Sequence, residues 1–152
     1  MAYWDWNSSY EIGLPVIDKQ HQRIIEYINE LHEALVSNNT AKLPEILISL
    51  KDYTVSHFAF EETLMEQAGY PLTAPHKKVH EAFIKTVEKY FQRYKDGEDI
   101  VGQLMAELQI WLTHHILNDD KDYKDSIQKM LLERKNVKKE EPKKSWFQRL
   151  FG

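Results

Sequence analysis

The sequence of 152 residues has no cysteine, only five glycines and five prolines, and no long apolar run. Without cysteine, disulfides, thiolate nucleophiles, zinc ribbons and iron–sulfur clusters are excluded, so any metal must be held by nitrogen and oxygen. No segment approaches the roughly 18 apolar residues of a membrane span, and residues 1–15 lack the basic and apolar regions of a secretion signal. We therefore expect a cytoplasmic protein.

The charge of the chain also limits its partners. The formal net charge is −4, and residues 136–152 hold five Lys or Arg but only two Glu, so the rest of the chain is more acidic still. Such an acidic body is not expected to bind nucleic acid. With 42% hydrophobic residues the chain is long enough for one domain with a real core. We expect that domain at 1–135, followed by a charged linker and tip at 136–152.

Four segments place apolar residues at three- and four-residue steps, which is typical of the buried face of an amphipathic helix. The segments are approximately 17–37, 43–68, 73–95 and 99–117. Short loops join them, so the sequence predicts an all-α, up-down-up-down four-helix bundle. A further helical pattern is expected to pack on the outside of the bundle through Tyr123, Ile127, Met130 and Leu131.

The loop between the second and third helices carries residues that favour helix ends. Gly69 suits the left-handed position that follows a helix. Thr73, between Pro71 and Pro75, is expected to be the N-cap of the third helix because its hydroxyl can accept a hydrogen bond from a free backbone N–H.

Polar residues interrupt these apolar faces in a recurring way. At about 100° per residue, all four helices point at least one such side chain inward. The inward polar residues are His21, His57, Glu61, His76, His80 and His115. Two pairs, His57 with Glu61 and His76 with His80, are spaced i, i+4 and so project from one face, one turn apart.

Chain direction puts these six residues in one layer. His21 and His76 lie near the starts of their helices, whereas Glu61 and His115 lie near the ends of theirs, and in an up-down-up-down bundle those ends coincide. A single buried histidine is more often structural, but a cluster of this size would share too few hydrogen-bond acceptors. The sequence therefore predicts a common metal site.

The two remaining histidines fit this site poorly. His32 follows His21 by eleven residues and lies about 16 Å further along the helix, so it reads as a core or interface residue. His114 points about 120° away from the apolar centre that His115 faces. Each of these adjacent histidines has an aspartate five residues later, and helix geometry alone does not choose between Asp119 and Asp120.

The pattern resembles the hemerythrin family, and most of all its bacterial single-domain members. The matching motifs are His21, His57-Phe58-x-x-Glu61-Glu62, His76-x-x-x-His80 and Trp111-Leu112-x-x-His115-Ile116-Leu117-x-x-Asp120. The resemblance covers about residues 4–123, including a Trp-x-Trp element at Trp4 and Trp6. It favours Asp120 over Asp119 by spacing alone.

The resemblance implies two iron ions, Fe2+ or Fe3+, with an oxide or hydroxide bridge. It assigns His76, His80 and His115 to one iron, and His21 and His57 to the other. It assigns Glu61 and Asp120 as carboxylates that bridge the two irons. Around two octahedral irons this set leaves one position open, on the iron with two histidines, where we expect dioxygen to bind. It also implies an apolar pocket wall made by Trp111, Leu112 and Phe58, although such residues at helical spacing are usually only core.

The expected function is reversible dioxygen binding by a carrier, store or delivery protein that is not an enzyme. Alternatives with the same site are an oxygen or redox sensor acting through a partner, a peroxide or nitric oxide reductase, and an iron-storage protein. A zinc hydrolase is least favoured, because seven ligands leave too little room for a substrate.

The end of the chain has a distinct composition. Four apolar residues stand beside three basic ones: Trp146, Phe147, Leu150 and Phe151; Lys143, Lys144 and Arg149. This short amphipathic tip suits a membrane surface or a protein partner, and a frayed tail is an equally good interpretation.

Overall fold

The computed structural model describes residues 2–140, which contain helices and no strand. The α-helices are α1 (Pro15–Val36), α2 (Leu43–Ala68), α3 (Thr73–Lys95), α4 (Val101–His114) and α5 (Lys121–Glu140). Two short 3-10 turns, η1 (Ser8–Tyr10) and η2 (Thr40–Lys42), precede α1 and α2. A π-helix, η3 (His115–Asp120), joins α4 directly to α5.

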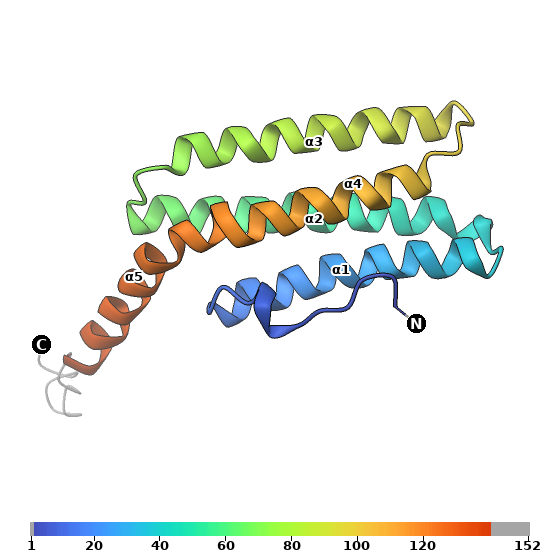
Figure 1. Cartoon of the computed structure of the whole chain (residues 1–152). Helices are drawn as coiled ribbons and strands as arrows, with labels where there is room; N and C mark the ends of the chain where they lie inside the picture. The colour runs from blue at the N-terminus through green and yellow to red at the C-terminus, as the bar shows by residue number, and fades with distance from the viewer. Residues whose placement is uncertain (1, 141–152) are drawn as a thin grey trace, which may run out of the picture.

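Helices α1 to α4 lie alongside one another in alternating directions (Figure 1). Contacts between α1 and α2, α2 and α3, α3 and α4, and α1 and α4 close the bundle around one core. The expected all-α, up-down-up-down four-helix bundle is therefore confirmed. Beyond η3, α5 turns away from the bundle, although it still packs against α2 (Figure 1).

The helices end close to their expected positions, with one error in capping. Gly69 has φ of +66° and ends α2 as predicted, which lets the Tyr70 N–H reach the Met65 carbonyl at 3.0 Å. Thr73 is not the N-cap of α3. Leu72 occupies that position, while the Thr73 hydroxyl donates to the Tyr70 carbonyl at 2.6 Å and stabilises the preceding turn instead.

The N-terminal arm is fastened along α1 by two side chains. The Asn29 amide accepts from the Trp4 N–H at 2.8 Å and donates to the Trp4 carbonyl at 2.9 Å. Nearer the start of α1, the Asp18 carboxylate accepts from the backbone N–H groups of Ile12 at 2.8 Å and Gly13 at 3.2 Å. These bonds hold the Trp4 side chain in the core.

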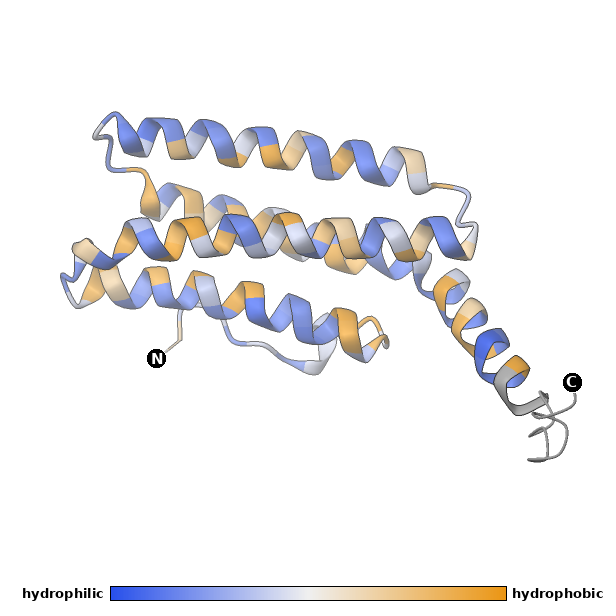
Figure 2. Ribbon diagram, turned by 180° about the vertical axis from the view of Figure 1, so that it is seen from behind, coloured by the Kyte–Doolittle hydropathy of each residue, from blue (hydrophilic) through white to orange (hydrophobic). Residues whose placement is uncertain are grey.

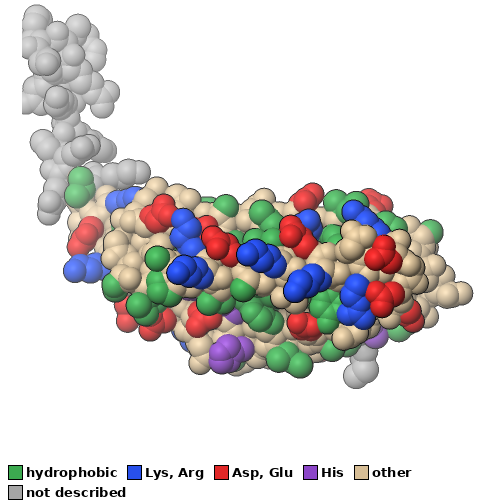
Figure 3. Space-filling view, turned by 90° about the horizontal axis from the view of Figure 1, so that it is seen from above, with side chains coloured by type: hydrophobic (Ala, Val, Ile, Leu, Met, Phe, Trp, Pro, Cys, Tyr) green, Lys and Arg blue, Asp and Glu red, His purple; other side chains and the backbone are tan. Residues whose placement is uncertain are grey.

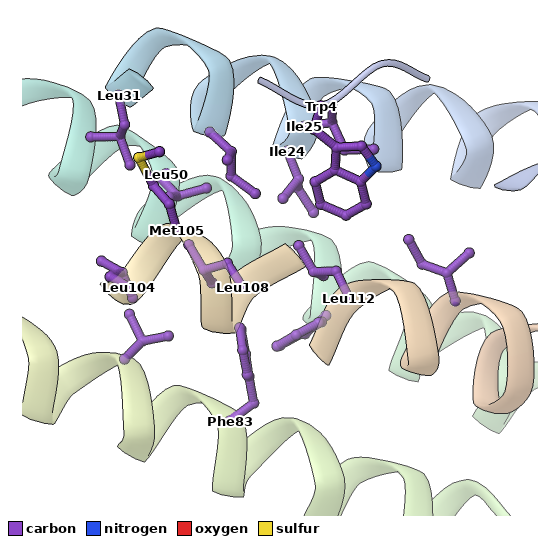
Figure 4. Close-up of a cluster of buried hydrophobic side chains, with 14 of the residues drawn as sticks. Trp4, Ile24, Ile25, Leu31, Leu50, Phe83, Leu104, Met105, Leu108 and Leu112 are labelled. Atoms are coloured by element: carbon purple, nitrogen blue, oxygen red, sulfur yellow. The ribbon is translucent and has the colours of Figure 1, made fainter. Parts of the chain in front are cut away.

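The core is a continuous apolar cluster between the helices. Figure 2 shows hydrophobic residues in stripes along the helices, with hydrophilic residues between them. Labelled core residues in Figure 4 are Trp4, Ile24, Ile25, Leu31, Leu50, Phe83, Leu104, Met105, Leu108 and Leu112. On the face over α3, basic and acidic side chains are interspersed, with no large patch of one sign (Figure 3). None of the described helices has the length and apolar character needed to cross a membrane.

Helix α5 packs against α2, as expected for the further helical pattern, and Tyr123 and Ile127 are completely buried. Leu131, expected to pack in the same way, is 44% exposed. The helix also continues to Glu140, so residues 136–140 of the expected linker are helical. The remainder of that linker and the amphipathic tip lie outside the described residues.

Candidate metal centre

Seven polar side chains meet inside the bundle, close to the point where α4 passes into η3. They come from α1, α2, α3 and η3, and none is more than 5% exposed. They are the seven residues proposed from the sequence as ligands: His21, His57, Glu61, His76, His80, His115 and Asp120. The structure thus brings the whole predicted set together.

Glu61 lies between histidines of different helices. Its Oε1 atom is 3.0 Å from His57 Nε2 and 3.5 Å from His21 Nε2. Its other oxygen, Oε2, is 3.3 Å from His80 Nε2 and 3.9 Å from His76 Nε2. One carboxylate therefore presents one oxygen to each of two sets of imidazole nitrogens.

Asp120 divides its two oxygens in the same way. Its Oδ2 atom is 3.1 Å from His21 Nε2, whereas Oδ1 is 3.2 Å from His76 Nε2 and 3.1 Å from His115 Nε2. Two groups of donors result. We call His21 and His57 the two-histidine group, and His76, His80 and His115 the three-histidine group. Both carboxylates span the two groups.

The π-helix explains how Asp120 reaches the cluster. In a regular α-helix a residue five positions after His115 would point about 140° away from it. In η3 the Lys121 N–H reaches the Ile116 carbonyl, five residues back, and this wider turn returns Asp120 to the side that His115 faces. Asp119 remains close enough to accept from His115 Nδ1 at 2.8 Å. The two aspartates thus contact opposite nitrogens of one imidazole.

Hydrogen bonds behind the histidines fix which nitrogen points inward. In each case Nδ1–H donates to a side-chain oxygen, which leaves Nε2 directed at the cluster. Three such bonds are present: His57 to Gln20 at 2.6 Å, His80 to Glu62 at 3.0 Å and His115 to Asp119 at 2.8 Å. None of these acceptors was assigned a role from the sequence. Two of them, Gln20 and Glu62, lie next to predicted ligands in the sequence, but each accepts a hydrogen bond from a histidine on another helix.

Tyr123 is a further contact that the sequence did not assign. Its hydroxyl donates to Glu61 Oε1 at 2.8 Å, and its side chain is completely buried. Tyr70, which packs edge-on against Tyr123, donates instead to Asp122. Tyr10 lies against tryptophans of the N-terminal arm. Of these three tyrosines, only Tyr123 contacts a predicted ligand.

Aromatic rings hold two of the histidines in place. Phe58 stacks on His80 with ring centroids 3.8 Å apart and nearly parallel planes. Trp111 stacks on His115 at 4.4 Å and also on Phe83 at 3.8 Å. Leu112 is buried one position further along α4. These contacts restrict rotation of the imidazoles and keep their surroundings apolar.

The cluster carries strong internal electrostatics. Burial disfavours the charged form of His21, but the adjacent carboxylates of Asp120 and Glu61 outweigh burial and raise its pKa from 6.5 to about 9. Burial also opposes ionisation of Glu61, yet the positive charge of His57 and the close approach of His21 and other histidines hold its pKa well below the usual range. The pKa of Asp120 is lowered in the same manner, chiefly by His115.

Several buried atoms of the cluster have no hydrogen-bond partner within the described residues. They are Glu61 Oε2, His76 Nε2 and both carboxylate oxygens of Asp120. Leaving buried polar atoms unpaired costs free energy, and a cation at the centre of these nitrogen and oxygen donors would satisfy all of them at once. The residues present therefore fit a metal, and the cluster is a metal site.

The other two histidines lie away from this site. His32 packs against the Tyr3 ring of the N-terminal arm, with ring centroids 5.1 Å apart. His114 is exposed, and its side chain contacts that of Asn118, one turn later. Neither belongs to the two groups of potential metal ligands found among the described residues.

Comparison with known proteins agrees with this geometry. Residues 13–127 match the Hemerythrin HHE cation binding domain family. A bacteriohemerythrin of Stenotrophomonas maltophilia is 50% identical over 127 residues, covering 84% of this chain and 83% of the relative. A bacteriohemerythrin of Pseudomonas aeruginosa is 47% identical over 133 residues, covering 88% and 87%.

Solved structures give the same result. A wild-type hemerythrin crystal structure superposes with a TM-score of 0.77 at 27% identity, covering 83% of this chain and 98% of that one. A variant of hemerythrin with leucine replaced by tyrosine superposes with a TM-score of 0.78 at the same 27% identity. Because the family match includes all seven clustered side chains, from His21 to Asp120, the chain belongs to the hemerythrin family.

Proposed function

We propose that the seven clustered side chains hold two iron ions, and that the protein binds dioxygen reversibly at this pair as a carrier, store or delivery protein. The observation that carries the proposal is the unequal division of the ligands. Three histidines face one position, two face the other, and Glu61 and Asp120 each direct one oxygen to either side. An ion with fewer protein ligands has room for an additional one.

The donor set favours iron over magnesium, calcium and structural zinc. Imidazole with carboxylate suits iron, whereas magnesium and calcium prefer oxygen alone, and structural zinc is satisfied by four ligands. When bound, the two irons supply the electrons that reversible dioxygen binding requires. Five imidazoles against two carboxylates favour binding over oxidative turnover, since carboxylate-rich di-iron sites are those of ferritin-like proteins.

The protein's own residues would protect the bound gas from water. We assign this role to Phe58, Trp111 and Leu112. Phe58 stacks on His80 and also lies beside His57 of the two-histidine group, Trp111 stacks on His115, and Leu112 is buried next to Trp111 in the chain. Excluding water from such a site prevents the proton leakage and side reactions that would make binding irreversible.

The test is to load the purified protein with ferrous iron without oxygen, measure iron per chain, and cycle oxygen against argon while recording the visible spectrum. We expect two irons per chain and an absorption band that appears and disappears over repeated cycles. His114→Ala should behave as the parent protein, whereas His115→Ala should not bind the pair. One iron per chain or an irreversible change would contradict the proposal, and sustained consumption of peroxide or nitric oxide with an electron donor would favour a reductase.

A further inference from the structure

The hydrogen bonds behind the histidines differ in charge. His80 and His115, both in the three-histidine group, donate from Nδ1 to the carboxylates of Glu62 and Asp119 at 3.0 and 2.8 Å. In the two-histidine group, His57 donates to the neutral amide oxygen of Gln20 at 2.6 Å. The Nδ1 atom of the other member, His21, has no partner among the described residues. Two negative charges therefore support one group, and none supports the other.

This difference has an electronic consequence. A carboxylate that accepts from Nδ1–H draws the proton toward itself and leaves the imidazole a stronger donor at Nε2. A stronger donor stabilises the higher positive charge of an oxidised metal, and the nearby negative charge acts in the same direction. A neutral amide does both to a smaller extent.

Tyr123 adds to the asymmetry from the other side. Its hydroxyl donates to Glu61 Oε1, which is the oxygen nearest to His57 and His21. A hydrogen bond to a carboxylate oxygen withdraws electron density from it, so Glu61 is the weaker donor toward the two-histidine group. Its Oε2 atom, on the side of the three-histidine group, has no such bond within the described residues.

We propose that Glu62 and Asp119 are positioning residues that make the metal of the three-histidine group the first of the pair to be oxidised. The metal of the two-histidine group, supported by Gln20, then stays reduced for longer. The inference rests on the proposed function only in that it takes both metals to be iron. It assigns each metal its place in the order of electron loss.

The exposure of the two carboxylates ranks their effects. The Glu62 side chain is 22% exposed and that of Asp119 is 40% exposed. Solvent screens the charge of the more exposed group more strongly. Glu62 should therefore contribute more than Asp119, although the His115 bond is the shorter of the two.

The experiment compares isosteric variants of the iron-loaded protein in an anaerobic oxidative titration with ferricyanide, which takes one electron from each ferrous iron and becomes ferrocyanide. Glu62→Gln and Asp119→Asn remove the charges, and Gln20→Glu adds one behind the two-histidine group. Glu66→Gln, one turn after Glu62 and paired with Lys77 on the surface, is the matched control. Mössbauer spectra count ferrous and ferric iron at each step.

Glu62→Gln should lower the ferric-to-ferrous ratio at a fixed potential by roughly tenfold, the lower end of outer-ligand effects at metal sites. The shift should appear in the first electron removed, with a smaller one for Asp119→Asn and none for Glu66→Gln. Gln20→Glu should raise the ratio in the second step and bring the two steps closer together. The higher ferric-to-ferrous ratio expected for Gln20→Glu tests the proposal even if Glu62→Gln or Asp119→Asn loses iron.

Unchanged first steps in both Glu62→Gln and Asp119→Asn with two irons bound would overturn the inference, as would a shift confined to the second step. Oxygen cycling of the same samples separates it from the proposed function. Ordered potentials without reversible oxygen binding would leave the inference standing and reject the carrier. Reversible oxygen binding with unchanged potentials would support the carrier and reject the inference about oxidation order. A parent protein that binds no iron pair would overturn both the carrier and the inference.

Discussion

The Tyr123 hydroxyl donates a hydrogen bond of 2.8 Å to Glu61, and this bond connects α5 to the metal site in α2. The two residues are 62 positions apart in the chain, and both are completely buried. Helix α5 is therefore part of the metal centre's structure, even though it turns away from the bundle beyond this point.

Replacing Tyr123 by Phe should destabilise the metal-free protein by about 1 to 3 kcal/mol, because Glu61 loses a donor that water cannot replace in the buried site. Urea denaturation followed by circular dichroism measures the change. Tyr70→Phe is the control. Its acceptor, Asp122, is exposed and can bond to water instead, so that the loss should be about 1 kcal/mol or less. Equal losses in both variants would speak against a special role for the Tyr123 bond.

Loss of either spanning carboxylate should abolish the paired site. Glu61→Ala and Asp120→Ala each remove oxygens that face both histidine groups, so each variant should bind fewer than two irons per chain. Elemental analysis after anaerobic loading and gel filtration gives the stoichiometry. Asp125→Ala, at an exposed position of α5, should keep the parent value. Two irons in both Glu61→Ala and Asp120→Ala would refute the bridging assignment.

The metal-free protein should lose stability as the pH rises from neutral. The pKa of His21 is raised from 6.5 to about 9 by Asp120 and Glu61 despite its burial. A raised folded-state pKa stabilises the protein fully below pH 6.5, and this contribution is lost as the pH passes through about 9. The shift corresponds to a loss on the order of 3 kcal/mol.

Denaturation of the metal-free protein between pH 6 and 10 tests this trend. The pKa of His115 is raised as well, again by Asp120 against the effect of burial, so His115 adds to the loss. His21→Gln should flatten the profile, whereas His32→Gln, on α1 beside Tyr3 of the N-terminal arm, should leave it unaltered. A profile for His21→Gln as steep as that of the parent would exclude His21 as a main source.

Trp111 should report iron binding through its fluorescence. Its ring stacks on His115 at 4.4 Å, close enough for an iron centre to quench it almost completely. Most of the iron-dependent quenching should therefore disappear in Trp111→Phe. Trp6→Phe is the matched control, because Trp6 packs on Tyr10 in the N-terminal arm. Quenching that survives in Trp111→Phe but falls in Trp6→Phe would place iron elsewhere.

The sequence predicted the inward histidines because the period of an α-helix is constant. His21, His57 and His80 lie on regular helices, so their directions follow from spacing to the neighbouring apolar residues. Asp120 could not be placed in that way, because η3 changes the helical period and no residue of this segment indicates that change in the sequence. Only the resemblance to the family selected it.

The supporting contacts were missed for a different reason. Gln20 bonds to a histidine of α2, and Glu62 to one of α3, so each pair depends on the angle and distance between two helices. Helical wheels describe one helix at a time and contain neither quantity. The bond from Tyr123 to Glu61 could not be assigned because the direction of α5 relative to α2 is set by η3, which the sequence did not reveal.

The central claim, an unequal pair of irons held by these seven side chains, is tested most directly by anomalous diffraction at the iron absorption edge from crystals of the iron-loaded protein. We predict two peaks between Glu61 and Asp120, one beside the Nε2 atoms of the three-histidine group and one beside those of the two-histidine group. A single peak, or two peaks with equal numbers of histidine ligands, would contradict the account.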